Sequence, residues 1–119
     1  YIVMERMPCT SVTDNTVRCS ITVQDDLVLA LGIDFDVTDT FTLTFADDGA
    51  IGAVETSSND PQLYHDARDW VLENRRERVE LPCNGNSGTA RDPGHCVSNM
   101  LEGYREYARV NALKPRAAK

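Results

Sequence analysis

Asp39 is the residue whose setting most favours chemistry. It lies in the run Val37–Phe45, where the other odd-numbered residues are hydrophobic and the even-numbered residues are threonines. This two-residue period predicts a strand with Asp39 on its apolar face. Burial would raise the pKa of such a carboxyl group, which can act as a general base or, when neutral, donate a hydrogen bond to an oxyanion. The alternative is a solvated carboxylate near the start of the strand.

Glu55 and Tyr64 are the candidate catalytic partners of Asp39. Residues 47–49 end in Asp-Gly, which is typical of tight hairpin turns, so residues 51–56 are expected to form the returning strand. A three-residue loop would place Glu55 on the face of Asp39, where two carboxyl groups push their pKa values apart. A two-residue loop would turn Glu55 outward, as an exposed edge carboxylate. Acid–base chemistry of this kind needs no cofactor.

Phe41, Leu43 and Trp70 are the candidate contacts for a small hydrophobic molecule. Phe41 and Leu43 share the apolar face of the strand with Asp39. Trp70 lies on the apolar side of the helix expected to follow the sheet. Together these side chains predict one wall of an apolar pocket.

The four cysteines predict either two disulfide bonds or buried free thiols. A first hairpin centred on Asp14 places Cys9 opposite Cys19, and a Cys83–Cys96 bond would close the loop between two helices. Four cysteines allow three connectivities, and buried free cysteines are common. The second bond would contribute about 3 kcal/mol in the chain-entropy model. Oxidised pairs would indicate secretion, whereas free thiols would favour the cytoplasm.

A metal site is not expected from the spacing of Cys83, His95 and Cys96, because structural zinc normally uses paired ligands such as Cys-x-x-Cys. The glycine-rich run 85–88 lacks the lysine and the preceding strand of a phosphate loop. The sequence has no Gly-x-Ser-x-Gly nucleophile elbow. None of these chemistries is supported.

The remaining patterns predict one α+β domain over residues 1–112. The chain has 119 residues, which suits a single core. Alternation and turn residues predict strands, and the two Asp-Pro dipeptides predict helix starts. The expected elements are a sheet over 1–57 that begins with a hairpin at 1–24, a strand or apolar bend at Leu27–Leu31, helices at about 61–77 and 93–110, a loop at 81–92 and a frayed tail at 113–119.

With its expected elements in this order, the chain resembles the nuclear transport factor 2-like superfamily, in particular its SnoaL-like branch. The resemblance implies a cystatin-like cone roll, in which a curved antiparallel sheet and its helices enclose a pocket. Members include isomerases, dehydratases, cyclases and non-catalytic binding proteins. The helices that usually precede this sheet are absent from the sequence, so we expect either that the sequence is a truncated form, or that another chain covers the sheet, or that residues 61–110 cover it. The segments that carry the resemblance are Thr16–Gln24, Asp34–Phe45 with the turn at 47–51, Asp60-Pro61 with Trp70, and Met100–Tyr107.

Charge and hydropathy narrow the function classes. Acidic residues outnumber basic ones by 19 to 12, and the net charge of -7 argues against nucleic acid as a partner. No run approaches the ~18–20 apolar residues of a membrane span. The first hypothesis is a protein with a small-molecule pocket. One form of this hypothesis is an acid–base enzyme of the isomerase, dehydratase or cyclase kind. The alternative is a non-catalytic binding or assembly module that forms a homodimer through its exposed sheet face.

Overall fold

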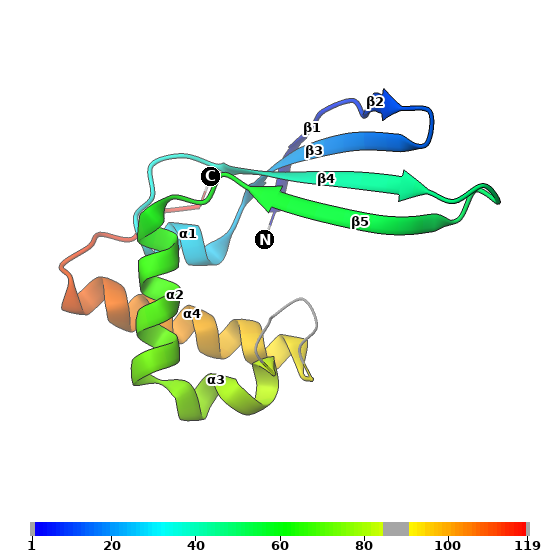
Figure 1. Ribbon diagram of the computed structural model, residues 1–119. Coiled ribbons are helices and arrows are strands. Elements are labelled where there is room, and N and C mark those ends of the chain that lie inside the picture. The colour runs from blue at the N-terminus through cyan, green and yellow to red at the C-terminus, as the bar shows by residue number, and fades with distance from the viewer. Residues whose placement is uncertain (1, 85–90, 119) are drawn as a thin grey trace. The chain divides into compact units, whose positions relative to one another are not determined.

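The computed structural model describes residues 2–84 and 91–118. By internal contacts the chain divides into two compact units (Figure 1). We call residues 1–25 and 35–60 the sheet unit, and residues 26–34 and 61–119 the helical unit. The fold class is α+β, as the sequence predicts, with an antiparallel sheet followed by helices that pack together.

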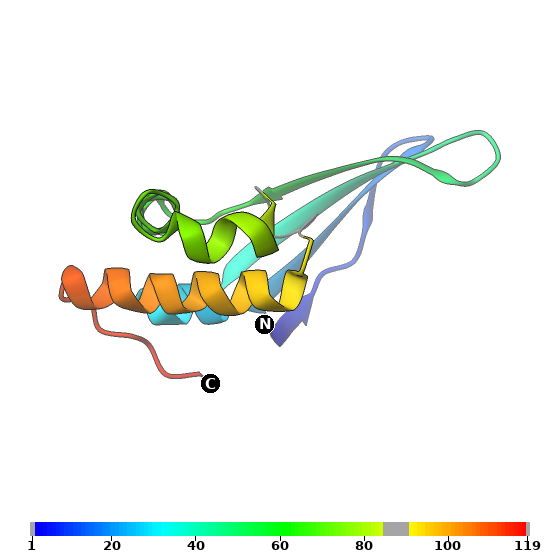
Figure 2. The same cartoon turned by 90° about the horizontal axis from the view of Figure 1, so that it is seen from below.

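The sheet unit is a five-stranded antiparallel sheet that stays open. Its order is β1-β3-β4-β5, and β2 also pairs with β3. The expected cone roll is therefore wrong, because the sheet does not curl. Strands β3 and β4 pair over eight successive positions with no bulge to turn a corner, so the ribbons run on side by side (Figure 2). The strands are β1 Ile2–Arg6, β2 Thr10–Thr13, β3 Thr16–Gln24, β4 Val37–Phe45 and β5 Ile51–Ser58.

The alternation predicted for β4 is confirmed by its register. Thr38, Thr40 and Thr44 lie opposite β3 residues that carry hydroxyl groups, and Thr42 lies opposite Arg18. The odd-numbered residues from Val37 to Leu43 lie opposite Val23, Ile21, Cys19 and Val17. Cross-strand hydrogen bonds between hydroxyl groups reinforce the threonine face. They join Ser20 to Thr40 at 3.1 Å and Thr22 to Thr38 at 3.2 Å.

The described residues of the helical unit form four helices, and the structure departs from the expected elements at two places. Residues Leu27–Leu31, expected as a strand or bend, form most of a short helix and are largely buried. The helix expected at 61–77 divides at Arg75, whose backbone leaves the helical region (φ -133°, ψ 31°). The second piece continues into the segment expected as a loop. The helices are α1 Asp26–Ala30, α2 Gln62–Asn74, α3 Arg76–Cys83 and α4 Pro93–Val110.

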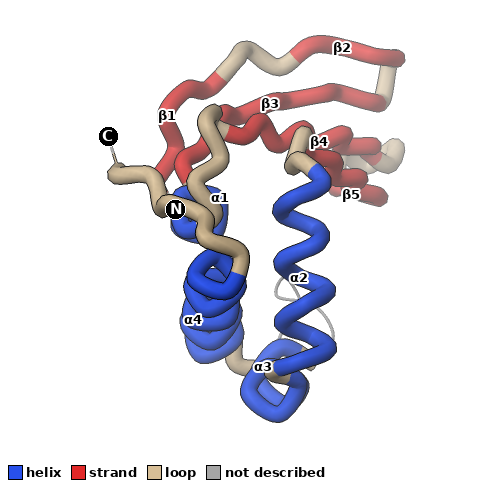
Figure 3. The backbone as a smooth tube through the Cα atoms, turned by 90° about the vertical axis from the view of Figure 1, so that its left-hand side faces the viewer, coloured by secondary structure: helices blue, strands red, loops and turns tan. Residues whose placement is uncertain are grey.

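The core of the helical unit forms where α2 crosses α4 (Figure 3). Tyr104 is fully buried there, and its hydroxyl group donates a hydrogen bond to the Tyr64 carbonyl at 3.1 Å. Gly103 allows the close approach, because a Cβ atom at this position would lie 2.7 Å from a Val71 methyl group. The helices therefore meet through a glycine packed against a buried valine.

The C-terminal segment packs against α1, which corrects the expected frayed tail over at least residues 113–116. The Arg116 amide donates to the Leu29 carbonyl at 2.7 Å. Gly32 has a positive φ of 71°, and a Cβ atom there would lie 2.1 Å from the Lys114 carbonyl oxygen. Glycine is thus required at this bend for both backbone conformation and space.

Candidate functional site

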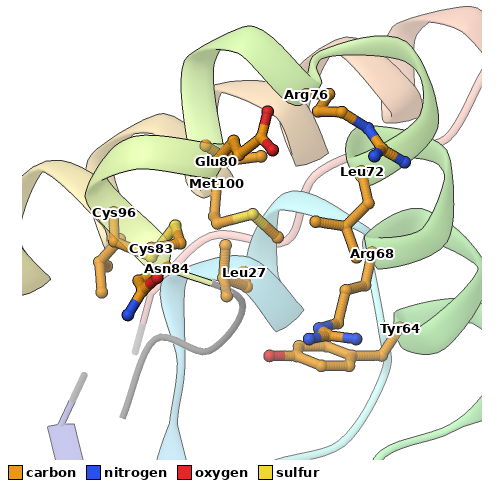
Figure 4. A pocket seen from close by; sticks show the side chains of 12 residues that line it. Leu27, Tyr64, Arg68, Leu72, Arg76, Glu80, Cys83, Asn84, Cys96 and Met100 are labelled. Carbon is orange, nitrogen blue, oxygen red and sulfur yellow. A yellow bond between two sulfur atoms is a disulfide. The ribbon is translucent and has the colours of Figure 1, made fainter. Parts of the chain in front are cut away.

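The helical unit contains a cleft with a volume of about 510 Å³, which we call the α2–α4 cleft (Figure 4). All of its lining residues belong to this one unit. Helices α1, α2, α3 and α4 all contribute. The lining residues are Leu27, Tyr64, Arg68, Leu72, Arg76, Val79, Glu80, Cys83, Asn84, Cys96, Val97 and Met100.

The interior of the cleft is apolar. Leu27 and Met100 occupy its middle, and Leu72 approaches from α2 (Figure 4). Val79 and Met100 are buried by their packing in the helical unit. Side chains of this kind offer a hydrophobic molecule the same surroundings as a protein core.

Two arginines supply positive charge on the α2 side of the cleft. Arg68 and Leu72 are four residues apart and therefore share one side of α2. Arg76, the first residue of α3, lies beyond Leu72 (Figure 4). Among residues 2–84 and 91–118, neither arginine side chain makes an ion pair or a hydrogen bond.

The neighbouring arginines, Arg75 and Arg78, are engaged by a carboxylate of α4. Arg75 Nε and Arg78 Nη1 each donate to a carboxylate oxygen of Glu106 at 2.6 Å. The hydrogen bond from Arg78, followed by that from Arg75, lowers the pKa of Glu106, while Glu106 raises the pKa of Arg78. The two hydrogen bonds to Glu106 hold the α2–α3 junction on α4, and Arg76 remains on the cleft side.

A disulfide bond forms the end of the cleft opposite the arginines (Figure 4). Cys83 at the end of α3 is bonded to Cys96 in the first turn of α4, and their Cα atoms are 4.7 Å apart. The second bond joins Cys9 to Cys19 in the sheet unit. These are the two pairs favoured by the sequence. Because both thiols are consumed, Cys83 and Cys96 cannot serve as metal ligands.

Asp92 fixes the start of α4 beside this bond. Its carboxylate accepts from the His95 amide at 3.2 Å and contacts His95 Nδ1 at 2.6 Å. The side-chain hydrogen bond between Asp92 and His95 raises the pKa of His95, and the same hydrogen bond lowers the pKa of Asp92. The predicted N-cap is therefore present and is coupled to a titratable side chain.

The pairing of Asp39 with Glu55, one of the two arrangements that the sequence left open, does not occur, and Glu55 is an exposed carboxylate instead. Asp39 lies opposite Ser58, whereas Glu55 lies opposite Thr42 on the threonine face. The reason is a bulge at Gly52, which adds one residue to β5 and shifts the register by one. Asp39 does share a face with hydrophobic neighbours, but it is partly exposed rather than buried.

The other predicted site residues are divided between the two units. Phe41 and Leu43 lie in the sheet unit and are partly exposed. Tyr64 lines the α2–α4 cleft, but Trp70 does not. The Trp70 ring instead lies 5.8 Å from that of Tyr107, with the Arg75 guanidinium 5.1 Å from its centroid.

Sequence reasoning missed Arg68, Arg76 and Leu27 as lining residues. The spacing of Arg68 and Leu72 was a usable signal, because residues four apart share a helix side. The contribution of Arg76 could not be seen, since it depends on the break at Arg75. Leu27 was hidden by its interpretation as part of a strand or bend.

The described residues lack the features of two other classes of site. Residues 2–84 and 91–118 contain no group of three His, Cys, Asp or Glu side chains placed to hold a metal ion. The same part of the chain has no helix with the length and hydropathy needed to cross a membrane. No protein-family model, curated protein or solved structure was found to match this chain.

Proposed function

We propose that the protein binds a small hydrophobic molecule in the α2–α4 cleft. The observation that carries this proposal is the apolar cleft of about 510 Å³ within one compact unit. Ligand sites in proteins commonly measure roughly 300–1,000 Å³ and are lined mainly by apolar side chains with a few polar groups. Leu27, Leu72 and Met100 would contact the body of the ligand.

We propose binding rather than turnover. The acid–base hypothesis relied on Asp39 with Glu55 or Tyr64 as helpers. Asp39 and Glu55 point to opposite faces of the sheet, and Tyr64 belongs to the helical unit. Among the described residues that line the α2–α4 cleft, Glu80 is the one carboxylate, so no paired carboxylates for acid–base work lie among them.

The two disulfide bonds support an oxidising compartment as the place of action. Such bonds persist in secreted and periplasmic proteins and are rare where thiols are kept reduced. Both units contain one bond. We therefore propose that the protein works outside the reducing cytoplasm.

Methyl NMR of the three methionines tests the binding site. Met100 lines the cleft, whereas Met4 and Met7 belong to the sheet unit. Titration with the neutral apolar probe phenylnaphthylamine should shift the Met100 signal and leave the other two in place. Shifts of Met4 and Met7 alone, or no shift at all, would refute the proposal.

A matched pair of variants separates cleft binding from general adhesion of the probe. Leu72→Glu places a charge in the apolar cleft and should weaken binding at least tenfold, because a charged group is costly to bury. Leu81→Glu makes the same change at a residue of α3 that is 71% exposed and outside the cleft. It should leave probe affinity unchanged.

A second candidate function is assembly with another copy of the chain through the apolar sheet face. The observation that favours it is incomplete burial, since Phe41 and Leu43 are partly exposed and Val54 is 53% exposed. Large exposed apolar patches commonly mark interaction sites. Light scattering at micromolar concentration should show a dimer that Leu43→Lys disrupts and Thr42→Lys, on the opposite face, does not. A wild-type monomer would exclude this assembly.

A further inference from the structure

We infer that the ligand of the α2–α4 cleft is an amphipathic organic monoanion, with its acid group on the α2 side of the cleft, where Arg68 and Arg76 lie, and its apolar body along Leu27 and Met100. This inference rests on the proposed function and adds the chemical class of the ligand. Its first support is the contrast between engaged and unengaged arginines in one short segment. Arg75 and Arg78 both contact Glu106, whereas Arg68 and Arg76 make no ion pair among the described residues.

Unengaged arginine side chains also occur elsewhere among the described residues, at Arg105 and Arg109, but those two do not line the α2–α4 cleft. The informative feature is therefore the position of Arg68 and Arg76 on an apolar cleft. A guanidinium group offers five donors in a planar fork that suits carboxylate, sulfonate or phosphate oxygens. Arg68 and Arg76 lie on either side of Leu72 along one side of the apolar cleft (Figure 4), so both positive charges attract an anionic head group placed there.

The charge of the lining sets the charge of the ligand. Its ionised side chains are Arg68, Arg76 and Glu80, which together give a formal charge of +1. One negative charge on the ligand would balance it, whereas a dianion would leave an excess of negative charge near Glu80.

The distribution of these groups gives the ligand a direction. The arginines lie on the α2 side, the Cys83–Cys96 bond lies at the opposite end, and Leu27 and Met100 lie between them (Figure 4). An anionic head at the arginines would therefore direct the apolar body toward the disulfide. A hydrophobic carboxylate or sulfonate has this polarity, whereas a neutral hydrocarbon leaves both guanidinium groups without a partner.

Two probes that share an aromatic skeleton test the inference. Anilinonaphthalene sulfonate carries one negative charge, and phenylnaphthylamine is its uncharged counterpart. Wild-type protein should bind the sulfonate about tenfold more tightly, and the preference should fall as salt is added, because partly exposed charges are screened. The Met100 methyl signal locates both probes in the cleft.

Arginine variants identify the groups responsible. The double variant R68Q/R76Q should lose about tenfold in affinity for the sulfonate and less than twofold for the neutral probe. R105Q changes an exposed arginine of α4 outside this cleft and should alter neither affinity. Equal wild-type affinity for both probes, or an equal loss of both in R68Q/R76Q, would overturn the inference while the proposed function stands. Failure of both probes to shift Met100 would overturn the proposed function and this inference with it.

Discussion

The sheet unit and the helical unit bury their residues to very different extents. In the sheet unit, the buried side chains are Val23, Gln24 and Val37, and every residue of β5 is exposed. The helical unit contains all the other buried side chains of the described chain, including Tyr104. Regular hydrogen bonding therefore defines the first unit, whereas side-chain packing defines the second.

This difference shows that a clear sequence pattern is no measure of burial. The alternation in β4 is the most regular pattern in the chain, yet Phe41 and Leu43 remain partly exposed. The short segment Leu27–Leu31 shows no usable period and is largely buried. The two-residue period of a strand shows which of its faces is apolar. It does not show which other residues bury that face.

The largest test of this contrast compares two aromatic truncations. Tyr104→Ala should lower the free energy of unfolding by about 4 kcal/mol, because it empties a fully buried site and removes a hydrogen-bond donor from the Tyr64 carbonyl. Phe41→Ala should cost about 1–2 kcal/mol, since its ring is already partly exposed. Urea unfolding followed by circular dichroism measures both. Equal losses would mean that the sheet unit is as tightly packed as the helical unit.

Removing each disulfide bond in turn compares the packing of the two units, because the two bonds close loops of similar length. The sequence separations are 10 for Cys9–Cys19 and 13 for Cys83–Cys96, so chain entropy predicts about 3 kcal/mol for either bond. Replacing the second pair with alanines should cost about 1 kcal/mol more, because both sulfurs are in buried residues while Cys9 is exposed. Thermal unfolding of the two double variants gives the comparison. A larger loss from the first pair would contradict it.

Two glycines of α4 test the packing of the helical unit. Gly103→Ala should destabilise by about 2 kcal/mol, because its new methyl group would lie within 2.8 Å of two Val71 methyl groups that cannot move outward. Gly94→Ala is the control, since the nearest atom to its new methyl group would be 3.9 Å away. Better helix propensity should make that variant neutral or slightly more stable. Matching losses in denaturant titrations would show that helix geometry, not packing, is responsible.

The smallest expected effect is the pH dependence of the cap on α4. The folded-state pKa of His95 is raised, so its contribution is full below the ordinary histidine pKa and is lost as pH rises through the folded value. The pKa of Asp92 is lowered, so its contribution is present above the ordinary carboxyl pKa and is lost as pH falls through the folded value. The cap is strongest between these limits. NMR titration of the His95 ring should show its pKa fall in Asp92→Asn, and an unchanged value would rule out the contact.

The sequence predicted local features better than it predicted the site. The strand alternation, the Asp92 cap and the two cysteine pairs all depend on residues near each other in sequence. The register of β5 could not be predicted, because the bulge at Gly52 reversed the face of Glu55.

The α2–α4 cleft was also beyond prediction from the sequence. The arginine side of the cleft depends on a break at Arg75 that is accompanied by a hydrogen bond to Glu106, 31 residues away in the chain. Its middle depends on α1, which is too short to show a helical period. Long-range side-chain contacts, rather than local pattern, create this site.

Trp70 makes the two units distinguishable by optical spectroscopy. It is the only tryptophan of the chain and belongs to the helical unit, with the Tyr107 ring and the Arg75 guanidinium close by. Selectively excited tryptophan emission therefore reports the melting of one unit and is silent about the other. Circular dichroism sees the strands as well, so a midpoint that differs between the two signals would reveal that the units unfold independently.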